Sequence, residues 1–104
     1  MSTPAKIAVM GHLRFPPDRM VDILPHLRRL VETTNREDGC ITYQVAIDPF
    51  DPGVIRFSEL WPDAQTLDRH IAAAHVVPWR EAQKNCGVLE RQYMIYDITG
   101  ARSV

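Results

Sequence analysis

The stretch Ile55–Trp79, IRFSELWPDAQTLDRHIAAAHVVPW, decides the fold of this 104-residue chain. Residues 55–61 alternate between two faces with the period of a β-strand. Pro62 interrupts the strand, and Asp63 is a suitable N-cap for a helix. The pattern therefore predicts a strand, then a helix to about residue 74, and then a second short helix that begins close to Pro78.

This corner also brings chemical groups to one side of the predicted sheet. Phe57, Glu59 and Trp61 share the apolar face of the strand, because side chains two residues apart point the same way. His70 lies on the apolar stripe of the following helix, and His75 lies at its end. We therefore expect the rest of the chain to enclose this corner.

The flanking sequence predicts three more strands and a long helix. Pro25 lies within that helix and either kinks it or delays its start. Asp38-Gly39 indicates a turn from helix to strand, with Gly39 in the left-handed conformation. The order is that of a ferredoxin-like βαββαβ fold, an α+β class with a four-stranded antiparallel sheet and helices on one face. The predicted flanking elements are strands at 6–15, 40–48 and 88–98 and a helix at about 18–36. Strand period places Ile41 and Ile47 on the helix-covered face, as part of the predicted core.

Composition limits the possible classes of protein. We expect a single domain, 1–104, with a core at about 6–98 and a tail at 99–104. The chain is 45% hydrophobic and 24% charged, with a net charge of −1. Its basic residues are scattered, which argues against nucleic-acid or membrane binding. Since no signal-peptide core or apolar run of ~18 residues is recognisable, we expect a cytoplasmic protein with reduced cysteines.

The face of the sheet opposite the helices is expected to pair with a second copy of the chain. Residues such as Met10 and Leu60 alternate there with Gln44, Arg56 and Ser58. Such a face is too apolar to remain in water and too polar for a core, so we expect a homodimer.

Several motifs resemble those of the antibiotic biosynthesis monooxygenase family, whose members form dimeric α+β barrels. They are REDGCITY, DPFDPGVIRFSELW, LDRH and HVVPW, and the resemblance covers about residues 6–98. It implies one of several activities: cofactor-free oxygenation of quinols or polycyclic aromatics, haem degradation, or sugar-phosphate isomerisation. Members without a known reaction share the fold, so the fold does not determine the activity.

Two departures from the family pattern argue against haem degradation. The first strand often carries an asparagine that faces the pocket, but this chain has Met10-Gly11-His12 there. The tryptophan of the haem-degrading members aligns with His70. Neither departure decides whether the chain oxygenates aromatic compounds.

The predicted catalytic groups are Glu59, His70 and His75, each with a structural alternative. Glu59 either forms a buried polar contact or acts as an acid/base group with a raised pKa. His70 is either a hydrogen-bonded core histidine or the base. His75 either caps a helix or stands at the mouth of a pocket as the base, with Glu59 as the orienting carboxylate.

Aromatic side chains could form the walls of a site for a flat substrate. Trp61, Trp79 and Phe57 are core residues or walls, and Tyr43 and Tyr93 could add hydroxyl groups. Histidines five residues apart diverge by roughly 140° on a continuous helix, so we expect no metal site. No phosphate-binding or nicotinamide motif is recognisable, and we expect no cofactor.

Three functional hypotheses follow. The first is a cofactor-independent monooxygenase of quinol-like or polycyclic phenolic substrates that uses O2. The second is an isomerase of a small polar or phosphorylated carbonyl compound, and the third is a non-catalytic dimeric module that binds a small ligand. Arg91 on the helix-covered face would favour an anionic ligand, whereas an unbroken apolar lining would favour a neutral aromatic one.

Overall fold

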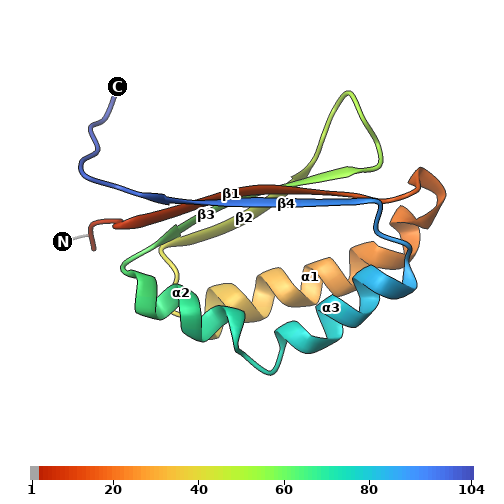
Figure 1. Ribbon diagram of the computed structural model, residues 1–104, viewed down its shortest axis with the longest axis horizontal. Helices are drawn as coiled ribbons and strands as arrows, with labels where there is room; N and C mark the ends of the chain where they lie inside the picture. Colours follow the sequence, from red (N-terminus) through yellow and green to blue (C-terminus); the bar gives the residue numbers. More distant parts are fainter. Residues whose placement is uncertain (1–2) are drawn as a thin grey trace.

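The computed structural model describes residues 3–104, which form one sheet with helices beneath it (Figure 1). Element types and order agree with the sequence pattern, so the predicted ferredoxin-like α+β fold is confirmed. The elements are β1 (Ile7–Arg14), a 3-10 turn (Pro17–Arg19), α1 (Met20–Glu37), β2 (Thr42–Ile47), β3 (Val54–Trp61), α2 (Ala64–Ile71), α3 (Val76–Asn85) and β4 (Glu90–Asp97).

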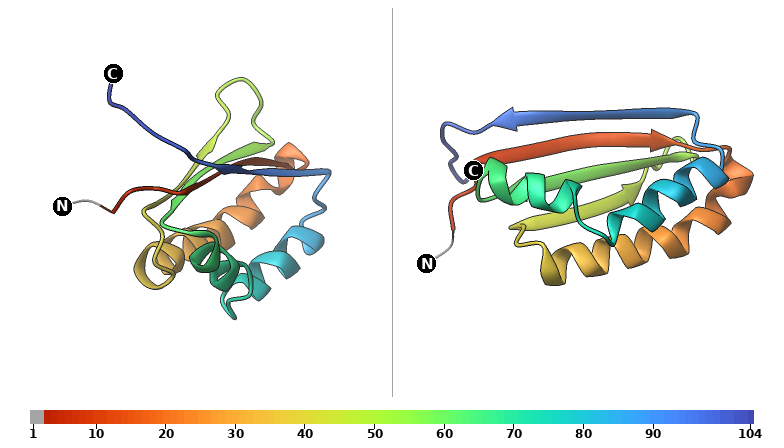
Figure 2. Two further views of the ribbon diagram at one scale, coloured as in Figure 1. Left: turned by 60° about the vertical axis from the view of Figure 1, so that its left-hand side comes forward. Right: turned by 60° about the horizontal axis from the view of Figure 1, so that its bottom comes forward.

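The sheet has the strand order β2-β3-β1-β4, and all of its pairs are antiparallel. Gly11 of β1 lies opposite Phe57 of β3 on one side and Tyr93 of β4 on the other. Because paired residues point to the same face, β4 contributes Arg91, Tyr93 and Ile95 to the helix side. The helices leave this edge strand largely uncovered, as Figure 2 shows.

Helix α1 packs against the sheet through an apolar stripe that includes Ile23, Leu27 and Leu30. The helix continues through Pro25, which cannot donate a hydrogen bond to Val21. Val21 is largely exposed, so water can satisfy its carbonyl. Within residues 3–104, no helix is long and apolar enough to cross a membrane.

Local signals in the sequence set the helix boundaries. The Asp63 carboxylate accepts a hydrogen bond from the Thr66 backbone N–H at 2.7 Å, which confirms it as the N-cap of α2. Gly39 has a φ of +75° after α1, as predicted. Both cysteines are free.

One part of the predicted core is wrong. Ile41 and Ile47 were expected under the helices, but they are 36% and 45% exposed. Ile41 precedes β2, and Ile47 is its last residue. Both lie at the ends of an edge strand, where alternation still fixes the face but no helix covers it.

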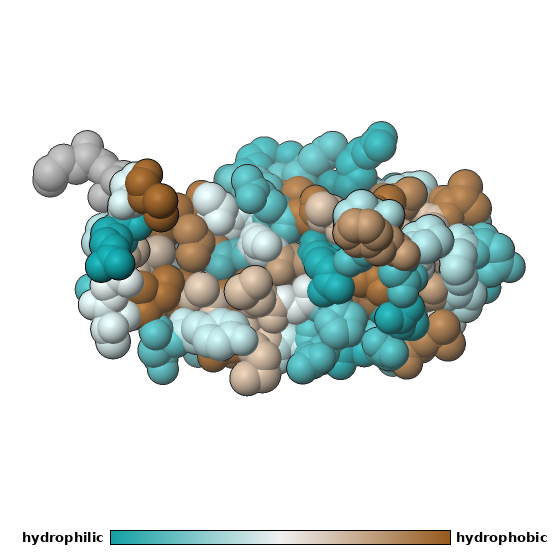
Figure 3. Space-filling view, turned by 90° about the horizontal axis from the view of Figure 1, so that it is seen from above, coloured by the Kyte–Doolittle hydropathy of each residue, from teal (hydrophilic) through white to brown (hydrophobic). Residues whose placement is uncertain are grey.

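The other face of the sheet is open and mixed in character (Figure 3). Hydrophobic and hydrophilic patches alternate across it. Met10 pairs with Met94 on this face, and they are 59% and 49% exposed. This face therefore mixes apolar and polar side chains, as the sequence predicted.

Candidate functional site

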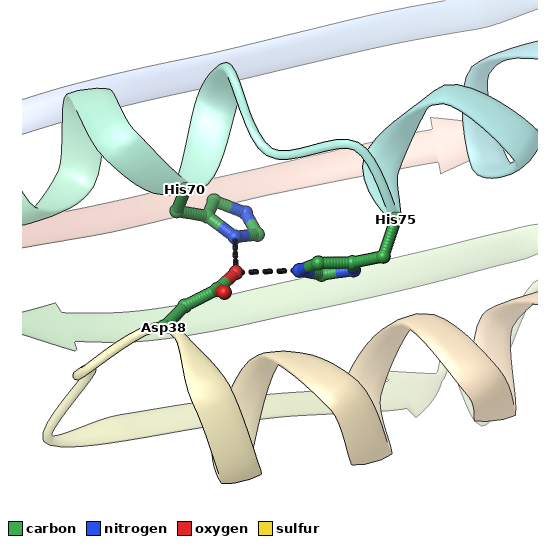
Figure 4. A group of neighbouring side chains, drawn as sticks. All are labelled: Asp38, His70 and His75. Carbon is green, nitrogen blue, oxygen red and sulfur yellow. Dashed lines mark hydrogen bonds and ion pairs between the residues drawn. The ribbon is translucent and has the colours of Figure 1, made fainter.

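Three side chains from separate segments converge where α1 ends (Figure 4). Asp38 is the C-cap of α1, His70 lies in the last turn of α2, and His75 immediately precedes α3. The Asp38 Oδ2 atom lies 2.6 Å from His70 Nδ1 and 2.7 Å from His75 Nε2. Because an ionised carboxylate only accepts hydrogen bonds, both imidazoles donate to this one oxygen.

A break between two helices makes this convergence possible. The expectation that the histidines diverge is wrong, because it assumed one continuous helix. Helix α2 ends at Ile71, and α3 begins only at Val76. Sequence reasoning also missed Asp38 as a site residue, since it was assigned only to the turn at Gly39. The available signal was an acid next to the glycine in the REDGC motif.

His70 is the histidine that reaches the main cavity. Its ring lies 4.9 Å from the Trp61 ring and 5.3 Å from the Tyr43 ring, between their centroids. Burial lowers the pKa of His70, although the hydrogen bond to Asp38 acts in the opposite direction. A neutral imidazole that carries its proton on Nδ1 has an unprotonated Nε2, which can act as a base.

His75 is placed differently from the expectation. It does not belong to the residues that line the main cavity. Its Nε2 is engaged by Asp38, and its Nδ1 is buried without a hydrogen-bond partner among the described residues. His75 therefore holds Asp38 in place from the α3 side. It does not stand at the mouth of the main cavity.

Glu59 is a buried carboxylate that faces the cavity from β3. It is 5% exposed and accepts a hydrogen bond from Trp61 Nε1 at 2.9 Å. Burial raises the pKa of Glu59 to about 7, although the bond from Trp61 acts in the opposite direction. Its hydrogen-bond partner is thus an indole, and the carboxylate that orients the histidines is Asp38.

The main cavity lies between the sheet and the helices α1, α2 and α3, towards the uncovered edge at β4. Its volume is about 230 Å³. Apolar and aromatic side chains make up most of the lining, and a few polar groups converge within it. The lining residues are Val9, Leu30, Tyr43, Glu59, Leu67, His70, Ile71, Val76, Trp79, Arg80, Gln83, Arg91, Tyr93 and Ile95.

The five predicted aromatic residues divide into two groups. Tyr43, Trp79 and Tyr93 line the cavity, whereas Trp61 and Phe57 are buried behind it. Burial raises the pKa of both Tyr43 and Tyr93. Their hydroxyl groups therefore stay protonated near neutral pH and can donate hydrogen bonds.

Gly11 shows what replaces the asparagine of the family pattern. A Cβ atom at Gly11 would lie 2.3 Å from Tyr93 Cδ1 and 2.7 Å from the Gln92 carbonyl oxygen. The Tyr93 ring thus occupies the space over this glycine. The first strand therefore offers no side-chain amide to a ligand at Gly11, and the Tyr93 ring fills the position of the family's asparagine side chain.

The convergent groups also have the donor types of a metal site. The ligand atoms of Asp38, His70 and His75 lie within 4.8 Å of one another, close enough to hold an ion. Two histidines and one carboxylate suit several divalent metals. Metal-binding histidines usually donate their second N–H to an acceptor, and the buried Nδ1 of His75 has none. This set therefore fits a metal poorly.

The family model that matches this chain is described as antibiotic biosynthesis monooxygenase, and it covers residues 6–82. The chain belongs to this family. The match includes Glu59 and all three members of the histidine–aspartate cluster. Membership supports monooxygenase activity in general terms and leaves the substrate class open.

Solved structures share this fold. A candidate antibiotic biosynthesis monooxygenase from Deinococcus radiodurans superimposes with a TM-score of 0.87 at 23% identity, over 94% of this chain and 97% of that one. Another structure, described as an antibiotic biosynthesis monooxygenase, has a TM-score of 0.78 and 28% identity, over 90% and 99%. An uncharacterised Synechocystis protein is 22% identical over 98 residues, which are 94% of this chain and 67% of that protein.

Proposed function

We propose that the protein is a cofactor-independent monooxygenase of a small quinol-like phenol, with His70 as the base. The observation that carries this proposal is the placement of His70, which lines an aromatic cavity while Asp38 holds its Nδ1 at 2.6 Å. Such a pairing fixes the tautomer and orientation of the ring, as in other carboxylate–histidine pairs. Asp38 is then a positioning residue, and Nε2 is the proton acceptor.

Glu59 is a second candidate for proton transfer. With a pKa of about 7, it can both accept and donate a proton near neutral pH. Its indole partner fixes one oxygen, Oε1, and leaves the other for a ligand. Glu59 could therefore donate a proton in the later step of an oxygenation, when the O–O bond breaks and one oxygen atom leaves as water.

The size of the cavity narrows the substrate class. An apolar cavity of about 150 Å³ can hold benzene. The volume of about 230 Å³ here suits one or two fused rings. Among the classes expected from sequence, this favours a quinol-like phenol over a larger polycyclic compound.

The proposed reaction balances without an added reductant. The base removes a phenolic proton, and the resulting anion transfers electrons to O2 and forms a C–O bond at the adjacent ring carbon. The O–O bond then breaks, one oxygen stays on carbon, and the other leaves as water with two protons. For a quinol the products are a hydroxyquinone and water, so all four electrons come from the substrate. The protein supplies binding, desolvation and proton handling.

We also propose that the working form is a homodimer through the open sheet face. The exposed pair Met10 and Met94, midway along β1 and β4, and the half-exposed Tyr96 support this. An interface of more than ~1,500 Å² in total is expected. A copy on this face would also lie next to β4, which forms the open side of the cavity.

A second candidate function is the isomerisation of a small anionic carbonyl compound. The observation in its favour is Arg91, which lies on the helix side of β4 and lines the cavity. The same base and acid would move a proton between two carbons. O2 consumption separates this candidate from the oxygenase.

The test measures O2 uptake by metal-free protein with a set of one- and two-ring quinols near neutral pH. His70→Gln should lower the protein-dependent rate ~100-fold, because one general base contributes about that much. The control is His26→Gln, which changes a histidine on α1 outside the cavity. Equal rates in both variants would remove His70 from the mechanism, and activity restored only by added metal would contradict cofactor independence.

A further inference from the structure

Two arginines face the main cavity without an acidic partner. Arg80 comes from α3 and Arg91 from β4, and both belong to the cavity lining. Among residues 3–104, neither has a carboxylate oxygen within 4.0 Å, in contrast to Arg14 and Arg56, which form ion pairs with Asp51 and Asp48. Their charges are therefore available to a ligand.

Each guanidinium is held by a neutral contact. Arg80 donates a hydrogen bond to the backbone carbonyl of Ile71, where α2 ends. The Arg91 guanidinium lies 4.9 Å from the centre of the Tyr93 ring. These contacts restrict both side chains, yet they use few of the five N–H donors that each arginine offers.

The remaining lining does not neutralise these two charges. Glu59 is the one carboxylate among the lining residues, and it lies buried on β3 with its hydrogen bond to Trp61. Burial keeps Glu59 partly protonated near neutral pH. The cavity thus combines an apolar interior with positive charge at its more exposed side, because both arginines are exposed residues.

We propose that Arg80 and Arg91 form an anion subsite at this side of the cavity, which binds a carboxylate or phosphate substituent of the substrate. This inference rests on the proposed function for the identity of the substrate, but anion binding itself does not require turnover. With the anionic group at the arginines, an attached ring lies deeper, between Tyr43 and Trp79. Its hydroxyl group can then approach His70.

The subsite predicts a selectivity between ligands of equal size. A neutral one-ring phenol fits the cavity but gains nothing from the arginines. An anionic analogue of the same size adds charge-assisted hydrogen bonds, which guanidinium groups form in a two-pronged geometry. We therefore expect the two classes of ligand to differ in affinity, with a strong dependence of the anionic class on salt.

The test is equilibrium binding, by calorimetry or tryptophan fluorescence, of three probes: hydroquinone, 4-hydroxybenzoate and 4-hydroxyphenyl phosphate. Wild type should bind at least one anionic probe ~10-fold or more tightly than hydroquinone. Arg80→Gln with Arg91→Gln should abolish this preference while the affinity for hydroquinone stays unchanged. The comparison of the two anionic probes distinguishes a carboxylate from a phosphate substituent.

The matched control is Arg28→Gln, which removes a charge on the exposed face of α1. It should leave all three affinities unchanged. If the double variant fails to fold, Arg91→Gln alone carries the test, since its side chain is exposed on an edge strand. Equal affinity of wild type for neutral and anionic probes, or an equal loss in Arg28→Gln, would overturn the subsite. Anion binding without O2 uptake would retain it and reject only the oxygenase.

Discussion

At the residue scale, Glu59 is a buried carboxyl group whose pKa is shifted into the neutral range. Its ordinary pKa of 4.5 rises to about 7 in the folded protein, because the carboxyl group is buried. The folded state therefore holds this proton more strongly than the unfolded state does. The stabilising contribution is present below pH 4.5 and is lost as the pH rises through 7.

Glu59→Gln should therefore stabilise the protein at pH 8, by an amount on the order of 1–3 kcal/mol, and change little at pH 5. The neutral amide avoids the cost of a buried charge, and its oxygen can still accept the bond from Trp61. Urea unfolding of both proteins at the two pH values measures this difference. A stability difference that is the same at both pH values would contradict the raised pKa.

At the scale of elements, the sequence predicted what depends on alternation and on local signals. Strand period placed Phe57, Glu59 and Trp61 on the covered face, and the Asp63 cap and the turn at Gly39 marked helix ends. The contact of Asp38 with both histidines was not predictable in this way. It depends on the length of the break between α2 and α3 and on the position of the C-terminal end of α1 relative to that break. Neither property follows from periodicity.

This contact leads to a prediction about the junction of α1, α2 and α3. Asp38→Ala removes the acceptor of two imidazole N–H groups, and the Asp38 side chain is only 9% exposed. Leaving such donors unsatisfied costs about 2–4 kcal/mol, which corresponds to a fall in Tm on the order of 10 °C or more. Differential scanning calorimetry measures this change.

The control for the junction is Asp22→Ala, since Asp22 in the first turn of α1 forms an exposed ion pair with Arg19 of the preceding 3-10 turn. Its Tm should stay within a few degrees of wild type. His75→Ala should also lower the Tm, contrary to the role of a residue at a pocket mouth, because it removes one of the two bonds to Asp38. Equal Tm values for Asp38→Ala and Asp22→Ala would show that the cluster does not hold the helices together.

At the scale of the whole molecule, the open sheet face should mediate assembly. Met94→Asp places a charge on this face midway along β4, opposite Met10, and should shift the protein from dimer to monomer at micromolar concentration. Light scattering coupled to size-exclusion chromatography measures the mass. Val21→Asp is the control, because Val21 is exposed on α1 away from the sheet. A monomeric wild type, or a dimer that Met94→Asp leaves intact, would exclude this interface.

The central claim is that the protein inserts one oxygen atom from O2 into a small phenol without a metal or an organic cofactor. The most direct measurement is turnover of a one-ring quinol under ¹⁸O₂ by protein that elemental analysis has shown to be metal-free. The account predicts one ¹⁸O atom in each hydroxyquinone, the second in water, and one O2 consumed for each quinol. Formation of hydrogen peroxide in equal amount with an unlabelled quinone would contradict it.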